Sequence, residues 1–173
     1  LDRVPCRPFH KERAGISVGE GGALALVERA GDARVLIEGV CETSDAYHVS
    51  APHPEGLGAQ AAMRQALQQA GCRSEDVDHV NAHGTGTRLN DSAEAKAIAA
   101  VFAHRVPVVS TKGFTGHTLG GAGALEFVFA AYAIEEGWLP ASLNAAPLDP
   151  EIPVYVPMVG TRGRIRRVLS NSF

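Results

Sequence analysis

The feature that most constrains the fold is an apolar segment of helical length, residues 122–136, which follows a glycine-rich stretch. Apart from Glu126 and the two glutamates at its end, nearly every residue of this segment is apolar, whichever side of the helix it occupies. A surface helix has a polar side, whereas a helix that is apolar all round is buried. We therefore expect this segment to be a buried helix that packs against a sheet.

Short apolar runs alternate with helix-like segments along the rest of the chain. This alternation predicts an α/β fold, a mixed β-sheet layered with α-helices, whose functional groups lie where strands end. The expected strands are residues 23–28, 35–41, 77–82, 106–110 and 168–170, and the expected helices are residues 59–70, 91–102 and 122–136. Gly71 suits the end of the first helix, and Asp91 suits the N-terminal cap of the second. The first two strands suit a hairpin.

Composition excludes several classes of protein. The length of 173 residues suits one domain, and 45% hydrophobic with 20% charged residues is a globular composition. A net charge of -3 argues against a nucleic-acid partner, and no apolar run approaches the ~20 residues of a membrane span. The three widely spaced cysteines predict a reducing, cytoplasmic setting without disulfides. Because no CxxC or HExxH occurs, no metal site is expected.

Three polar residues, His83, Lys112 and His117, stand where expected strands run into glycine-rich loops. Converging in one pocket, they would form a donor cluster able to hold an oxyanion or a thioester carbonyl. Each residue alone has a plainer interpretation, because a histidine before glycine is often a turn or core residue and a lone lysine is usually solvated. The glycine-rich stretch also lacks the spacing of a nucleotide-binding loop. These patterns alone indicate an α/β domain with a candidate His/His/Lys site.

The ordered motifs of the chain resemble those of the β-ketoacyl-acyl-carrier-protein synthases, condensing enzymes of the thiolase-like superfamily. Order and spacing both fit, and the resemblance covers essentially the whole chain. Ser-Thr-Lys-Gly-x-Thr-Gly-His resembles the elongating type more than the modular polyketide type, in which Lys-Ser-Asn-x-Gly-His is usual. The motifs are Asn81–Thr87, Asn90-Asp91-x-x-Glu94-Ala95, Ser110–Glu126 and Ser170–Phe173, preceded by Arg7-Pro8-Phe9, by Gly15-x-x-x-Gly19-Glu20-Gly21 and by Ser44–His48.

The resemblance implies that residues 1–173 are the C-terminal half of a thiolase-like fold, in an acyltransferase of the 3-oxoacyl-acyl-carrier-protein synthase type. In this family a cysteine takes an acyl group from acyl carrier protein. Malonyl carrier protein then loses CO₂, and its carbanion attacks the acyl thioester. The implied partners are acyl carrier protein, the missing N-terminal half and a second subunit in a homodimer or heterodimer. No cofactor is implied beyond the phosphopantetheine arm of the carrier protein.

The resemblance also implies a role for each matching residue. His83 and His117 match the two histidines that hydrogen-bond the malonyl thioester carbonyl, so they would stabilise the enolate formed on decarboxylation. Lys112 matches the lysine that supports the charge and hydrogen-bond network of the site. Glu126 matches the helical glutamate that pairs with this lysine, as a carboxylate in an apolar helix requires.

Two threonines near the first histidine have a weaker implied role. Thr85 and Thr87 match hydroxyls that lie near the pantetheine arm in the family. Their alternative interpretation is ordinary turn chemistry, since threonine hydroxyls often bond to nearby backbone in turns.

The chain departs from the family in two respects. None of Cys6, Cys41 and Cys72 matches the nucleophile, which lies in the first half of the fold, and the glycine-rich loop that carries the gating aromatic should follow Phe173. The chain begins at Leu1 rather than methionine and stops in an apolar run, so both ends are interpreted as cuts within a longer protein. We expect this fragment to supply half of a site and to be inactive alone.

Two other functions remain open at this point. One is a non-condensing partner subunit, such as a chain-length factor or a decarboxylating homologue, although both histidines and the lysine are retained. The other is a plain ligand-binding or interaction module. A basic run, Arg162-x-Arg164-x-Arg166-Arg167, suits docking of an acidic carrier protein, but such runs are more often a solvated strand face or loop.

Overall fold

A parallel sheet forms the centre of the computed structural model, which describes residues 4–29, 31–103 and 105–173. Its three strands lie in the order β2-β1-β5, and both pairings are parallel. A separate antiparallel pair joins β3 to β4. The sequence predicted the three central strands, two of them at greater length and the third, residues 168–170, with the observed bounds. The strands are β1 (His79–Asn81), β2 (Val108–Val109), β3 (Trp138–Leu139), β4 (Thr161–Arg162) and β5 (Val168–Ser170).

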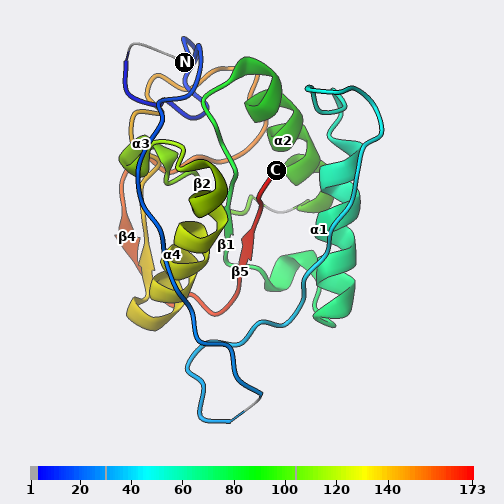
Figure 1. Ribbon diagram of the computed structural model, residues 1–173, viewed down its shortest axis with the longest axis vertical. Coiled ribbons are helices and arrows are strands. Elements are labelled where there is room, and N and C mark those ends of the chain that lie inside the picture. Colours follow the sequence, from blue (N-terminus) through cyan, green and yellow to red (C-terminus); the bar gives the residue numbers. More distant parts are fainter. Residues whose placement is uncertain (1–3, 30, 104) are drawn as a thin grey trace.

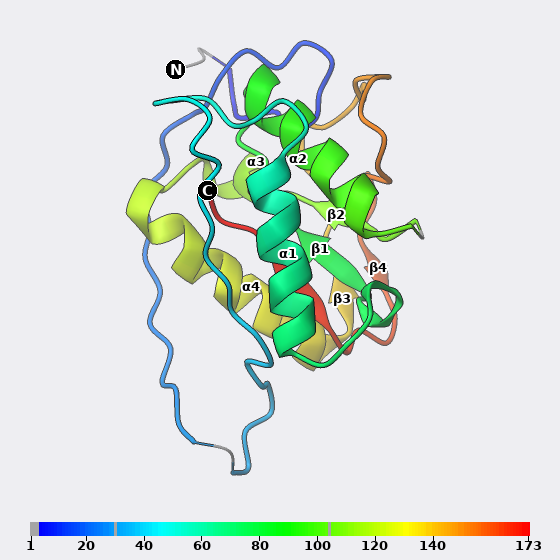
Figure 2. The same ribbon diagram turned by 90° about the vertical axis from the view of Figure 1, so that its right-hand side faces the viewer.

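Helices cover both faces of the sheet, as Figures 1 and 2 show, with α1 and α2 on one side and α4 on the other. The α/β fold class expected from the sequence is therefore correct. The apolar core lies between the sheet and the α1–α2 pair, and includes Met63, Val80 and Ile98. The helical elements are α1 (Leu57–Gln69), η1 (Ser74–Asp76), α2 (Arg88–Val101), α3 (Lys112–Thr115), η2 (Leu119–Gly121) and α4 (Ala122–Glu136).

The two expected N-terminal strands, residues 23–28 and 35–41, are not strands, and their hairpin does not form. This stretch runs extended past α4 and returns beside α1 (Figure 1). Leu24 is 100% exposed and Leu26 is 86% exposed. The apolar runs are real, but a strand also needs a neighbour that pairs with its backbone. Among the described residues no strand pairs with this stretch.

Helix α4 is less buried than its sequence predicts. Only Ala122, Glu126 and Ala133 are buried, and Tyr132 is 58% exposed. One side of the helix packs on β5 and β3. A second side, with Phe127 and Ile134, borders a cavity of about 490 Å³ between α1, α4 and β5, which the extended segment 34–41 also lines. The helix is therefore packed tightly on one side only.

The expected boundaries of the other two long helices were partly right. Gly71 follows α1 with φ +62°, and the N–H of Cys72 returns to the Leu67 carbonyl at 3.1 Å, which is the expected helix end. Asp91 does not cap α2, because the helix begins three residues earlier, after Thr87. The buried Asp91 side chain instead accepts backbone N–H groups from outside the helix.

Candidate active site

The candidate residues lie at one end of the central sheet. Chain leaving β1 reaches His83, and chain leaving the neighbouring β2 reaches Lys112. Because parallel strands end at the same edge of a sheet, these side chains meet, and Lys112 Nζ lies 3.4 Å from His83 Nδ1. The rings of His83 and His117 are edge to face, with centroids 5.2 Å apart. Phe173, beyond β5, packs on the other side of His83 at 5.5 Å.

A buried ion pair joins Lys112 to Glu126 of α4. Both side chains are almost fully enclosed, with 1% and 3% of their surface exposed. Burial raises the pKa of Glu126, while the neighbouring Lys112 ammonium and its hydrogen bond act in the opposite direction. The pair thus places a positive charge next to His83. Glu126 contacts Lys112, which is the partner that was expected for it.

Hydrogen bonding assigns the proton of each histidine to the same ring nitrogen. Nδ1 of His83 faces the Lys112 ammonium, a group that can only donate, so this nitrogen accepts. Nδ1 of His117 accepts the backbone N–H of Leu119 at 3.1 Å. Both rings therefore keep Nε2–H as their free donor.

Both histidines are also held neutral. Burial lowers the pKa of His83 to about 3, with further contributions from Lys112 and His117. The pKa of His117 is lowered by burial and then by Lys112. At neutral pH the site therefore offers two uncharged N–H donors beside one ammonium group, an arrangement that suits an oxygen atom on which negative charge develops.

Glu94 fixes the backbone of the His83 loop, a contact that the sequence reasoning missed. Its two carboxylate oxygens accept the N–H groups of His83 and Gly84, each at 2.8 Å. The side-chain amide of Asn171 donates to the same carboxylate at 3.1 Å. Burial raises the pKa of Glu94 to about 7 despite these bonds. The motif spacing that placed Glu94 after the loop was the only signal available in the sequence.

Ser110 joins the two loops that carry His83 and Lys112. Its hydroxyl donates to the Gly84 carbonyl at 2.8 Å and accepts the N–H of Lys112 at 3.3 Å. A Cβ at Gly84 would lie 2.5 Å from the Ser110 Cβ, and Gly84 has φ +41°. Only glycine satisfies both conditions, so the Gly-Thr-Gly sequence after His83 serves close packing.

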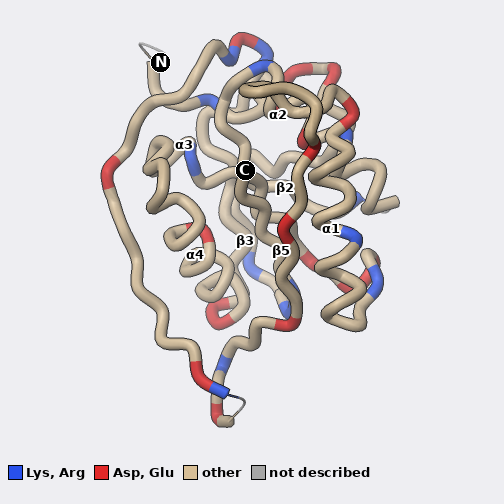
Figure 3. Tube along the Cα trace, turned by 45° about the vertical axis from the view of Figure 1, so that its right-hand side comes forward, with Lys and Arg blue, Asp and Glu red and all other residues tan. Residues whose placement is uncertain are grey.

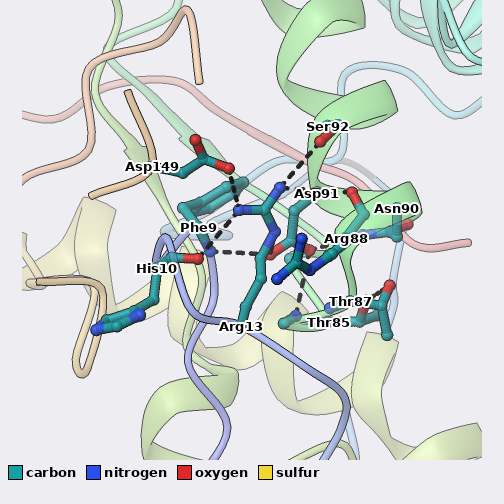
Figure 4. Close-up of polar contacts among 12 residues, drawn as sticks. Phe9, His10, Arg13, Thr85, Thr87, Arg88, Asn90, Asp91, Ser92 and Asp149 are labelled. Atoms are coloured by element: carbon teal, nitrogen blue, oxygen red, sulfur yellow. Dashed lines mark hydrogen bonds and ion pairs between the residues drawn. The ribbon is translucent and has the colours of Figure 1, made fainter. Parts of the chain in front are cut away.

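A buried network also ties the N-terminal segment to the His83 loop (Figure 4). Asp91 accepts the N–H of Phe9 at 2.8 Å and the N–H of Gly86 at 3.2 Å. Arg13, 2% exposed, reaches Asp91 at 3.5 Å and Asp149 at 2.5 Å. Burial raises the pKa of Asp91, and its hydrogen bonds and Arg13 oppose this rise. Residues 9–13 are thereby fixed beside the loop.

The two threonines of the loop bond to each other. Thr85 Oγ1 and Thr87 Oγ1 are 2.9 Å apart, and the Thr87 N–H points to Thr85 Oγ1 at 3.4 Å. This geometry is the turn chemistry that the sequence left open as the alternative. Contact with a pantetheine arm stays a prediction.

The three cysteines lie in surroundings unsuited to a nucleophile. Cys6 is buried and donates to the Thr85 carbonyl at 3.1 Å, and burial raises its pKa to about 11. Burial also raises the pKa of Cys72, which follows α1. Cys41 lies on the extended segment and contacts Gln65 of α1. A thiolate is the reactive form, and burial disfavours it at Cys6 and Cys72.

Internal contacts engage most of the basic run. Arg166 pairs with Asp78 at 3.8 Å and Arg167 with Glu38 at 2.9 Å, while Arg162 lies over the Trp138 ring at 5.8 Å. Charges of both signs are interspersed along the trace (Figure 3). These contacts favour the interpretation of a solvated loop, since only Arg162 lies in a strand, and carrier-protein docking there stays a hypothesis.

Acid should destabilise the protein through His79, a buried β1 residue whose two ring nitrogens have no partner among the described residues. Burial lowers its pKa to about 4, against an opposing effect of Asp78. The unfolded chain, with a histidine pKa of about 6.5, binds this proton first as the pH falls. The destabilisation caused by His79 is therefore absent well above pH 6.5 and develops between about pH 6.5 and 4.

The measurement is the free energy of unfolding in urea at several pH values, for the natural protein and for His79→Leu. The natural protein should lose about 3 kcal/mol relative to the variant across this window. Because Glu94 and His83 are present in both proteins, their titration cancels in the difference. If the free energies of unfolding of the two proteins changed in parallel with pH, His79 would not be the cause of the acid destabilisation.

Comparison with known proteins agrees with this geometry. The family described as "Beta-ketoacyl synthase, C-terminal domain" matches residues 35–146, well over half of the chain. The chain belongs to the β-ketoacyl synthase family. It is 42% identical to 3-oxoacyl-acyl-carrier-protein synthase 2 of Mycobacterium bovis over 97% of this chain, and 40% identical to nodulation protein E of Rhizobium meliloti over the same share.

A solved structure, "The ishigamide ketosynthase/chain length factor", matches 99% of the chain with a TM-score of 0.89 and 35% identity. The chain spans less than half of each of these proteins, namely 42%, 44% and 44% of their lengths. The fold expected from the resemblance, that of the ketosynthases, is thus confirmed. Along the described part of this β-ketoacyl synthase chain, every helix is too short or too polar to span a membrane.

Proposed function

We propose that this chain supplies the malonyl-activating half of a 3-oxoacyl-acyl-carrier-protein synthase. The observation that carries the proposal is the pair of neutral histidines, His83 and His117, whose Nε2–H groups are free to donate beside Lys112. A malonyl thioester presents a carbonyl oxygen that suits two such donors. The chain's own residues therefore match the decarboxylation step of condensation.

In that step the malonyl carbonyl oxygen accepts hydrogen bonds from both histidines. The bond between the carboxylate and the α-carbon breaks, CO₂ leaves, and the electron pair moves toward the thioester oxygen as an enolate. The two donors stabilise this oxygen more strongly as its charge grows, which accelerates the step. Lys112 keeps Nδ1 of His83 as an acceptor, so the proton stays on Nε2.

The enolate carbon then attacks an acyl thioester, forming the new carbon–carbon bond and expelling a cysteine thiolate. That cysteine belongs to the part of the protein outside this chain, since Cys6, Cys41 and Cys72 do not suit the role. The proposed partners are acyl carrier protein, which delivers both thioesters on its phosphopantetheine, the remaining half of the fold and a second subunit. The proposed setting is the cytoplasm, without a further cofactor.

A second candidate is a non-condensing partner subunit, because the matched ishigamide structure is described as a ketosynthase and chain length factor together. The two candidates differ in acyl transfer. Full-length protein containing this chain is incubated with acyl and malonyl carrier proteins, and both product and protein are analysed by mass spectrometry. A synthase acquires a covalent acyl group and releases 3-oxoacyl carrier protein. CO₂ release without a new carbon–carbon bond would favour the partner subunit.

A further inference from the structure

The segment Gly15–Gly19 touches both histidine loops through its backbone. The N–H of His117 donates to the Ser17 carbonyl at 2.7 Å, and the His117 carbonyl accepts the N–H of Gly19 at 3.1 Å. Val18 and His117 thereby form an isolated parallel β-bridge. At the other end of the segment, the N–H of Gly15 donates to the Gly86 carbonyl at 3.1 Å, in the loop that follows His83.

Gly19 leaves no space for a side chain. A Cβ at this position would lie 1.8 Å from the Thr115 carbonyl oxygen and 2.9 Å from the Thr115 carbonyl carbon. Both atoms belong to backbone, so a rotamer change cannot relieve the clash. Gly116 is equally constrained from the opposite side, because its Cβ would lie 2.8 Å from the Ser17 carbonyl oxygen and its φ is +65°. The two backbones thus approach each other as closely as only glycine allows.

His117 depends on this contact for its placement. It lies in the short connection between α3 and η2, outside any helix or longer strand. Val18 is 57% exposed, so the bridge is not held by burial of an apolar side chain. The backbone bonds to Ser17 and Gly19 are therefore the restraints that fix the main chain of His117 directly.

We propose that Gly15–Gly19 is a backbone strut that sets the separation of the two histidine rings, and that Gly19 is its positioning residue. The inference rests on the proposed function, in which both Nε2–H groups converge on one oxygen. Convergence demands accuracy, because a displacement of about 1 Å can cost 10²-fold in rate. A Cβ at Gly19 pushes the 115–117 backbone away and moves His117 relative to His83.

The test compares Gly19→Ala with Gly22→Ala in the full-length synthase. Gly22 lies three residues beyond the segment, and a Cβ there would meet nothing within 4 Å. Malonyl carrier-protein decarboxylation should fall 10- to 100-fold in kcat for Gly19→Ala, while acyl transfer to the protein stays within about twofold. Gly22→Ala should match the natural protein in both. A proportional loss of both activities, or no loss, would overturn the positioning role.

Ser17→Gly keeps the inference testable if Gly19→Ala does not fold. This change introduces no clash, but it removes the Ser17 hydroxyl bond to the Val4 carbonyl at 2.9 Å and loosens the strut. We expect a two- to fivefold decrease in decarboxylation alone, and unchanged decarboxylation would count against the strut. His117→Ala, measured in parallel, separates the two ideas. If it retains full activity the proposed function fails, whereas an inactive His117→Ala beside a fully active Gly19→Ala overturns only the strut.

Discussion

Replacing His83 or His117 by alanine in the full-length synthase is expected to lower malonyl carrier-protein decarboxylation by about 10²–10³-fold. In the proposed function, each substitution removes one of two donors that converge on the thioester oxygen. Their effect should lie mainly in kcat, because these hydrogen bonds strengthen as the oxygen becomes charged. The measurement is CO₂ release under saturating malonyl carrier protein.

Glutamine at either position distinguishes hydrogen-bond donation from proton transfer. Its side-chain NH₂ can donate as the Nε2–H does but cannot act as an acid or base at neutral pH. His83→Gln and His117→Gln should therefore retain more activity than the alanine variants. His48→Ala is the matched control, since His48 lies exposed in the loop before α1 and bonds only locally. Undiminished decarboxylation in both alanine variants would leave a plain ligand-binding module as the better interpretation.

The residues of the site whose positions could be predicted from the sequence are mainly those that directly follow the ends of strands. His83 and Lys112 follow β1 and β2, two adjacent parallel strands, so their meeting follows from the fold class and the motif positions. The cost of a lone carboxylate in an apolar helix indicates that Glu126 has a partner, and the family resemblance implied that this partner is Lys112. Local pattern indicated the candidate residues, and the resemblance supplied the pairing.

Other features depend on long-range contacts that leave no local pattern. Glu94 was visible only as a motif residue, yet it accepts the backbone N–H groups of the His83 loop. Gly19 was visible only as a motif glycine, and its close contact with Thr115 left no local pattern. The strands expected at residues 23–28 and 35–41 failed for the opposite reason, because their apolar runs are present but no strand among the described residues pairs with them. The local sequence pattern indicates which type of secondary structure a segment suits. Contacts with other parts of the chain decide whether that structure forms.

Breaking the Lys112–Glu126 pair should have the largest effect on stability. Both side chains are almost wholly buried, so removal of one leaves an unpaired charge inside the protein. Lys112→Met or Glu126→Leu should each lower the free energy of unfolding by about 3–5 kcal/mol. For Lys112→Met the loss should be smaller at pH 5 than at pH 8. Burial already raises the pKa of Glu126, and without Lys112 the carboxyl takes up a proton and becomes neutral more readily.

The double variant Lys112→Met/Glu126→Leu separates the two roles of the pair. With both charges gone, neither member of the pair leaves an unpaired buried charge, so stability should return to within about 1 kcal/mol of the natural protein. Decarboxylation should stay low, because no ammonium faces Nδ1 of His83 and its proton is no longer confined to Nε2. Urea denaturation and CO₂ release, measured on the same preparations, give the comparison. If activity returned together with stability, Lys112 would be a structural residue, and the two histidines alone would define the site.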